Sequence, residues 1–122
     1  MKNLSVTLES YNDQNIFAKI LRGEISCKKI YEDSYALAFY DVFPKAAAHA
    51  LVIPKKPYVC FDGFITQASD DEITGFFKAV GKTIELLGVA EEGFRLVSNS
   101  GEHGGQEVPH FHVHIMGGEK LS

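Results

Sequence analysis

Three histidines stand at alternate positions near the C-terminal end of the chain, at His110, His112 and His114. Apolar residues, Phe111 and Val113, separate them. Because successive side chains of an extended strand point to opposite faces, this spacing predicts a row of imidazoles on one face and an apolar row on the other. An imidazole with an ordinary pKa near 6.5 is partly neutral at pH 7, so it can act as a nucleophile, a general acid or base, or a metal ligand.

The segment in front of the histidines is rich in glycine. Gly101, Gly104 and Gly105 lie within residues 100–107, and glycine permits backbone conformations that turn several amide N–H groups toward one anion. The sequence has neither the GxxxxGK[ST] phosphate loop nor the GxGxxG dinucleotide fingerprint. A glycine loop that leads into a row of histidines favours nucleophilic catalysis at a phosphate group.

Metal binding and simple packing also stay open as roles for the histidines. An H-x-H pair on a strand can hold zinc when a third ligand comes from another part of the chain. Histidines on a half-exposed strand can also serve packing alone. The glycine-rich segment favours catalysis, because neither a zinc site nor packing requires a loop able to bind an anion.

Two helices are predicted to pack against the strands. Apolar residues recur at helical spacing over residues 14–22, and Gly23 follows as a C-terminal stop. A longer apolar stripe follows residues 69–72 and ends at Gly88. The sequence of residues 69–72, Ser-Asp-Asp-Glu, is typical of a capping box at the start of a helix. The chain is therefore expected to have one short and one long helix.

Five segments have the composition of strands, and a polar turn separates the first two as in a hairpin. They are residues 28–31, 35–40, 49–53, 94–98 and 108–115. Hairpin and meander connections favour a five-stranded, mainly antiparallel sheet. Packed by the two helices, this sheet gives an α+β fold.

Length, charge and cysteine spacing limit the classes of function. The 122 residues fit a single domain over residues 14–122 behind a flexible polar arm over residues 1–13. A net charge of −4 and scattered lysines favour neither nucleic acid nor a membrane surface as partner, and no apolar run has transmembrane length. Cys27 and Cys60 form no CxxC pair, so we expect free thiols, a cytoplasmic protein and a small-molecule ligand.

The histidine segment resembles the signature of the histidine triad (HIT) family, H-φ-H-φ-H-φ-φ, in which φ is an apolar residue. The resemblance covers most of the chain and extends to Ile16-Phe17, Glu32-Asp33, residues 39–41, Pro44, His49, residues 51–55, Asn99 and Gly105-Gln106. Gly117 and Gly118 follow the signature, and this ending resembles that of the nucleoside phosphoramidate hydrolases, the Hint branch of the family. The branch that hydrolyses dinucleoside polyphosphates usually continues into Pro-Arg instead.

The resemblance implies a HIT-like fold, a homodimer, and a hydrolase that needs no cofactor and no metal. His112 would attack the phosphorus of a purine nucleoside 5′-phosphoramidate and form a covalent nucleotidyl-histidine, which water then hydrolyses. His114 would contact the phosphoryl oxygens, while His110 and His49 would support the site. Two alternatives stay open: a dinucleoside polyphosphate hydrolase, and a nucleotide-binding interaction module that has kept the pocket.

The resemblance also implies a pocket for the AMP or GMP moiety of the substrate. Asp41 would accept hydrogen bonds from the ribose hydroxyls, and Asn99 would bind near the scissile phosphate. The base would lie in an apolar clamp, and the phosphate would lie against the glycine loop. The expected residues are Ile16, Phe17 and Val42 for the base, and Gly105, Gln106, Glu107 and Val108 for the phosphate.

The chain departs from the family pattern at two places. Glu107 stands where many members of the Hint branch carry a serine or threonine whose hydroxyl is thought to help protonate the leaving group. We hypothesise that the Glu107 carboxylate points outward and receives a cationic amine leaving group, while its backbone amide serves the phosphate. Residues 15–18 lack the C-x-x-C that feeds a structural zinc site in some bacterial relatives, so we expect no structural metal.

Overall fold

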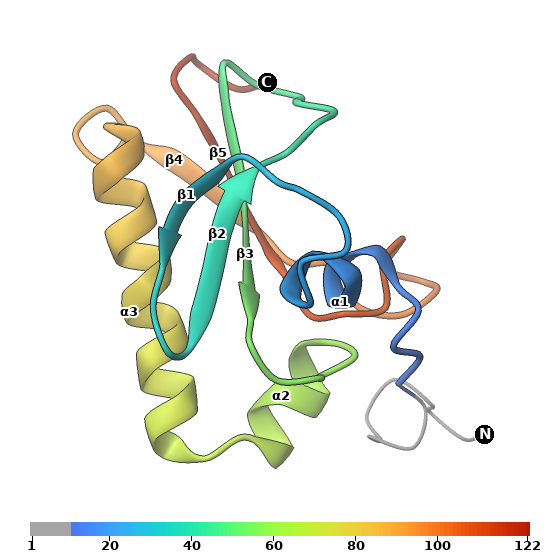
Figure 1. The fold of residues 1–122 in the computed structure, drawn as a ribbon. Coiled ribbons are helices and arrows are strands. Elements are labelled where there is room, and N and C mark those ends of the chain that lie inside the picture. Colours follow the sequence, from blue (N-terminus) through green and yellow to red (C-terminus); the bar gives the residue numbers. More distant parts are fainter. Residues whose placement is uncertain (1–10) are drawn as a thin grey trace.

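Five strands form one antiparallel sheet in the order β1-β2-β3-β5-β4 (Figure 1). The structure is a computed structural model that describes residues 11–122. Its strands are β1 Lys29–Glu32, β2 Ala36–Tyr40, β3 Ala48–Pro54, β4 Phe94–Val97 and β5 Val113–Gly117, and its helices are α1 Ile16–Leu21, α2 Phe61–Gln67 and α3 Asp70–Leu87. The predicted α+β fold with a five-stranded sheet is confirmed.

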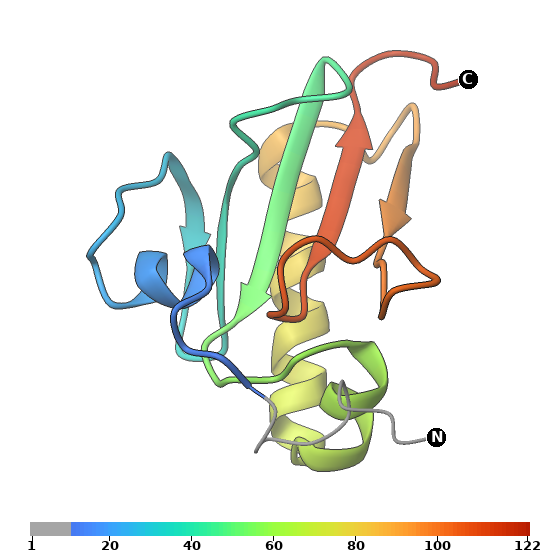
Figure 2. The ribbon, with the colours of Figure 1, turned by 90° about the vertical axis from the view of Figure 1, so that its right-hand side faces the viewer.

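The two faces of the sheet are covered by different helices. Figure 1 shows α3 and α1 on opposite sides of the strands, and Figure 2 shows α3 running behind β3 and β5. Strand β2 is buried on both faces: Ala36 and Ala38 pack in the core beneath α3, while Leu37 and Phe39 pack with Phe17 of α1. The α1 face is the one on which the histidines lie.

The apolar residues between the histidines anchor that segment in the core beneath α3. The Phe111 side chain is 1% exposed and stacks on Phe64 of α2 with ring centroids 4.8 Å apart. Val113 and Ile115 belong to the same cluster. The predicted alternation between an apolar and an imidazole face is therefore confirmed.

The predicted strand over residues 108–115 is wrong at its start, because β5 begins only at Val113. Pro109 has no N–H to give to a neighbouring strand. The backbone N–H of His110 bonds to Val108 O at 2.8 Å, and that of Phe111 bonds to Tyr58 O at 2.7 Å. Of the three histidines, only His114 is a strand residue.

The helix boundaries follow their capping chemistry. Helix α3 begins with the predicted capping box, in which Ser69 Oγ accepts from Glu72 N and the Glu72 carboxylate accepts from Ser69 N, and it ends at Gly88 in the left-handed conformation. Helix α2 was not predicted. Its N-cap is Cys60, whose side chain makes no capping hydrogen bond, so the sequence carried no start signal.

Three further sequence predictions concern the N-terminal arm, the two cysteines and membrane-spanning segments. Residues 1–10 of the predicted arm lie outside the described residues, while Tyr11 is described and contacts the histidine segment. Neither Cys27 nor Cys60 forms a disulfide within the described residues, as expected. Among the described residues, no helix has the length and apolar character needed to cross a membrane.

The capping box leads to a prediction about stability. Ser69→Ala removes the acceptor for one of the first N–H groups of α3, so it should lower the free energy of unfolding by about 1 kcal/mol. Urea denaturation followed by circular dichroism measures the change. Ser69→Asp, which keeps a side-chain acceptor at the N-cap, is the control and should stay near wild type. Equal stability of Ser69→Ala and wild type would contradict the assigned role.

Candidate functional site

A cavity of about 460 Å³ opens on the α1 face of the sheet. It brings together most of the residues that the sequence singled out: Ile16, Phe17, Asp41, Val42, Asn99, Gly105, Glu107, Val108, His112 and His114. Three others do not line the cavity: His49, His110 and Gln106. The volume lies in the range of small-molecule sites.

The ring of His112 is held in one orientation by the backbone of the same segment. Its Nδ1 lies 2.7 Å from His110 O, and a carbonyl oxygen can only accept, so Nδ1 carries the proton and Nε2 keeps a lone pair. The edge of Phe17 packs on the ring with centroids 5.0 Å apart. Burial lowers the pKa of His112. A neutral imidazole with a free Nε2 on a ligand cavity is a suitable nucleophile.

A second hydrogen-bond chain orients His114. The N–H of Lys45 donates to His49 Nδ1 at 2.9 Å, so the proton of His49 is on Nε2. That proton points to His114 Nδ1, 3.0 Å away. His114 therefore carries its own proton on Nε2, as a hydrogen-bond donor. His49 is buried, which explains why it supports His114 instead of lining the cavity.

Asp41 lies next to this pair of histidines at the edge of the cavity. One carboxylate oxygen, Oδ1, accepts from Phe43 N at 2.9 Å, and Oδ2 lies 3.4 Å from His49 Nε2. Asp41, His49 and His114 hold ligand atoms within 4.8 Å of one another, which is a spacing that a metal ion could use. The proton on His49 Nε2 already joins the two imidazoles through His114 Nδ1, and the Asp41 carboxylate lies 3.4 Å from the same nitrogen, so these ring atoms are engaged without a metal.

His110 is a fully buried member of the site, at 0% exposure. Its Nε2 lies 3.0 Å from Pro54 O, and its Nδ1 lies 2.6 Å from Tyr11 Oη. Burial lowers the pKa of His110 to about 4, so its ring is neutral at pH 7. Sequence reasoning missed Tyr11, because it stands 99 positions before His110 and outside any motif.

The glycine loop is held in shape by Gln106. Its Oε1 accepts from Gly101 N at 2.9 Å, and its Nε2 donates to Val59 O at 2.6 Å and to Val108 O at 3.0 Å. These bonds engage the Gln106 side chain within the protein, so the structure shows it shaping the loop that the sequence predicts to hold phosphate. Within residues 11–122, the backbone N–H groups of Glu107 and Val108 have no protein acceptor.

The rest of the cavity wall is mostly apolar. Phe39, Leu51 and Cys27 form part of it beside Ile16 and Phe17, and they were not identified from the sequence because they have the pattern of ordinary core residues. Two further apolar side chains stand at the rim: Val42 is 78% exposed and Phe43 is 79% exposed. Among the described residues that line the cavity there is no lysine and no arginine.

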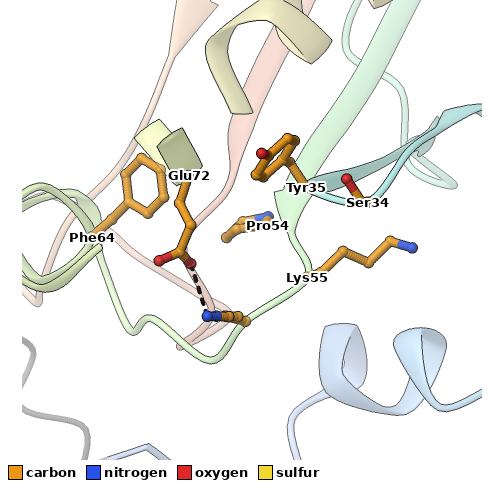
Figure 3. Close-up of a pocket in the computed structure, with 7 residues that line it drawn as sticks. Ser34, Tyr35, Pro54, Lys55, Phe64 and Glu72 are labelled. Carbon is orange, nitrogen blue, oxygen red and sulfur yellow. Dashed lines mark ion pairs between the residues drawn. The ribbon is translucent and has the colours of Figure 1, made fainter. Parts of the chain in front are cut away.

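A smaller cavity of about 180 Å³ lies beyond the C-terminal end of β3 (Figure 3). Its wall includes Lys55 and Glu72, and the dashed line marks the ion pair between Lys56 and Glu72, with Nζ and Oε2 3.6 Å apart. Lys55 pairs with Glu32 at 2.7 Å. Because carboxylates pair with both lysines, neither cation of this wall is left unpaired to hold an anion.

A model of the HIT domain matches residues 22–121. The chain belongs to the HIT family. An uncharacterized 13.2 kDa HIT-like protein of Azospirillum brasilense is 50% identical over 113 residues, covering 93% of this chain and 93% of that protein. The purine nucleoside phosphoramidase of Escherichia coli K12 is 36% identical over 109 residues, covering 89% of this chain and 91% of the enzyme.

A solved structure agrees with the fold of this HIT protein. A histidine triad protein from Clostridium difficile superposes with a TM-score of 0.79 at 39% identity, covering 91% of this chain and 96% of that one. The domain match and the relatives show family membership, and the solved structure supports the α+β fold with its five-stranded antiparallel sheet.

The buried, neutral His110 predicts that acid destabilises the protein. Its folded-state pKa of about 4 lies below the ordinary 6.5, so between these values the unfolded chain binds a proton that the folded chain does not. Stability is therefore full above about pH 6.5 and falls as the pH drops toward 4. His110 alone should cost about 1 kcal/mol between pH 7 and pH 5.5.

Urea denaturation at several pH values measures this slope. His110→Gln should reduce the slope without abolishing it, because burial also lowers the pKa of His114 to about 4 and lowers that of His49 and His112. The exposed His103, replaced by glutamine, should leave the slope as in wild type. Carboxylates contribute little in this window, since the pKa of Glu32 is held at about 2 and that of Glu72 below its usual value. A wild-type stability that is constant from pH 7 to pH 5.5 would contradict the assignment.

Proposed function

We propose that this HIT protein is a hydrolase that cleaves the P–N bond of purine nucleoside 5′-phosphoramidates through a nucleotidyl group on His112. The observation that carries the proposal is the hydrogen bond from His112 Nδ1 to His110 O, which leaves the Nε2 lone pair available at a cavity of about 460 Å³. The similarity to the Escherichia coli enzyme named as a purine nucleoside phosphoramidase supports the choice of substrate.

In the first step, the Nε2 lone pair forms a bond to the α-phosphorus while the P–N bond breaks. The electron pair of that bond goes to the amine nitrogen, which takes up a proton from solvent and leaves as the free amine; the water that attacks in the second step returns a proton to solvent. His112, now carrying the nucleotidyl group on Nε2, is cationic. The carbonyl of His110 and the carboxylates of Asp41 and Glu107 favour this charge. Water then attacks the phosphorus, releases the nucleoside monophosphate and restores the neutral imidazole.

The phosphoryl oxygens are proposed to meet neutral donors. His114 offers Nε2–H, because its Nδ1 accepts from His49. The N–H groups of Glu107 and Val108 supply two more donors from the loop shaped by Gln106. Such prearranged donors stabilise the charge that develops on the oxygens during attack.

The apolar half of the cavity is proposed to hold the purine of an AMP or GMP moiety, with Ile16, Phe17 and Val42 around the base. Asp41, at the boundary with the histidines, is proposed to accept from the ribose hydroxyls. Asn99 lines the phosphate half, and its side chain makes no hydrogen bond to any described residue, so it is available to a ligand. We also propose that the protein is a cytoplasmic homodimer that works without a bound metal.

The central test is the loss of activity in His112→Ala. Without the attacking Nε2, hydrolysis of adenosine 5′-phosphoramidate should fall at least about a thousandfold, while AMP still binds, because the cavity and the neighbouring donors remain. Release of AMP in the presence of EDTA measures the rate, and intact-protein mass spectrometry after a rapid quench looks for the nucleotidyl adduct.

The control for this test is His103→Ala, an exposed histidine of the glycine loop that does not line the cavity. It should keep the wild-type rate. Activity that persists in His112→Ala, or that requires added metal, would refute the proposed mechanism. Turnover of diadenosine polyphosphates in preference to phosphoramidates would favour the other hydrolase branch.

Glu107 generates a prediction about the leaving group. Its side chain is exposed at the cavity, so it is placed to attract a cationic amine such as the lysyl side chain. Glu107→Ser should reduce the preference for a lysyl over a neutral-amine phosphoramidate by about two- to fivefold, as expected for an exposed charge pair. The ratio of kcat/KM for the two substrates measures it. Glu102→Ser, outside the cavity, is the control. An unchanged ratio in Glu107→Ser would refute this role.

A further inference from the structure

We infer that Tyr11 is a positioning residue that keeps the nucleophile in its reactive tautomer by fixing the ring of His110. The inference rests on the proposed function for its kinetic consequence. Tyr11 does not line the cavity, and its hydroxyl bonds to His110 instead of reaching the base clamp or the glycine loop. Its route to the reacting atoms is therefore through His110.

The segment before α1 holds Tyr11 in place. Asn15, the N-cap of α1, bonds through Nδ2 to Asn12 O at 2.8 Å, and Arg22 Nη1 donates to Asp13 O at 2.7 Å. These contacts tie residues 12 and 13 to both ends of the helix. The Tyr11 ring then meets the His110 ring edge to face, with centroids 5.6 Å apart.

The hydroxyl of Tyr11 completes the hydrogen bonding of His110. Since Pro54 O can only accept, His110 carries its proton on Nε2, and Nδ1 is left as an acceptor. Tyr11 O–H donates to that Nδ1 at 2.6 Å. Because the His110 ring is fully buried, water has no access to replace this donor. The ring is thus held at both nitrogens by elements far apart in the sequence.

Fixing the ring also fixes the peptide that controls His112. The carbonyl of His110 accepts the His112 Nδ1 proton at 2.7 Å, and Ser98 Oγ donates to His112 O, two residues further along, at 2.9 Å. If His110 shifts, the Nδ1–H of His112 loses its acceptor, and the tautomer with the proton on Nε2 gains population. That tautomer has no lone pair at the attacking atom, so it cannot form the P–N bond to the nucleotide.

The chain offers a closely matched pair of variants. Tyr11→Phe removes only the hydroxyl that reaches His110. Tyr31→Phe removes a hydroxyl that donates to Asp33 Oδ2 at 2.9 Å, on β1 and away from the cavity. Both substitutions keep the aromatic ring and delete one side-chain hydrogen bond.

The expected kinetic result is a change in kcat with little change in KM. For adenosine 5′-phosphoramidate, Tyr11→Phe should lower kcat about three- to tenfold, the effect of losing one typical hydrogen bond, and leave KM within about twofold. Tyr31→Phe should leave both unchanged. The effect of Tyr11→Phe should vanish in a His110→Leu background, whose side chain has no atom that can accept from Tyr11 Oη.

Nitrogen-15 NMR of the histidine rings reports the tautomer of His112 directly. If Tyr11 only stabilised the fold, Tyr11→Phe would leave these chemical shifts unchanged. In wild type, His112 should show a protonated Nδ1 and an unprotonated Nε2. In Tyr11→Phe, the two His112 signals should move toward each other as the second tautomer gains population, and the His110 Nδ1 signal should shift as it loses its donor. Tyr31→Phe should give the wild-type spectrum.

The outcomes separate this inference from the proposed function. If wild type does not hydrolyse phosphoramidates, the proposed function fails, and the NMR comparison still decides whether Tyr11 controls the His112 tautomer. If wild type is active but Tyr11→Phe has a wild-type kcat and wild-type histidine signals, the inference is overturned. A lower kcat with unchanged His112 signals, or an equal loss in Tyr31→Phe, overturns it as well.

Discussion

The hydrogen bond between His112 Nδ1 and the carbonyl of His110 is the interaction on which the rest of the site depends. This bond determines which nitrogen of the His112 ring holds the proton. Its acceptor is a backbone carbonyl, which does not change its protonation state with pH. The partners of His110 determine where that carbonyl lies: Pro54 O and Tyr11 hold its ring, and the Phe111 N–H bonds to Tyr58 O. A short irregular segment in front of β5 is therefore held by bonds to distant parts of the chain.

The site relies on burial to keep its histidines neutral. Burial lowers the pKa of His49 and His112, and it lowers that of His110 and His114 to about 4. The histidines also disfavour one another's charge, since His112 and His49 both lower the pKa of His114. A neutral ring offers one donor and one acceptor, whereas a charged ring offers two donors and no acceptor. The same burial is what ties the stability of the fold to pH.

Much of the fold could be predicted from local patterns. The capping box at Ser69, the left-handed Gly88 and the alternating core of the histidine segment are all local signals, and all three were correct. The start of β5 was not predictable by alternation, because alternation reports which face a side chain takes and not where the backbone N–H groups bond. Helix α2 had no start signal in the sequence, because its N-cap is Cys60 and not one of the serine, threonine, aspartate or asparagine residues that usually cap a helix.

The candidate site was predictable only where a motif marked it. The histidines were visible from spacing, whereas Tyr11 acts across 99 positions and Phe39 or Leu51 have the pattern of ordinary core residues. Gln106 does not line the cavity, because its side chain bonds to Gly101, Val59 and Val108 across the base of the glycine loop. Such long-range contacts depend on how elements pack together, which no local pattern records.

The lack of lysine and arginine among the described residues that line the cavity has a consequence for how an anion would bind there. Attraction between full charges weakens as ionic strength rises, whereas hydrogen bonds from prearranged neutral donors in a partly dry site are screened far less. A nucleotide held in this way would keep its affinity in concentrated salt, because salt would screen only the repulsion from the Asp41 and Glu107 carboxylates at the cavity. It would also leave without having to escape a strong opposite charge, which favours rapid product release.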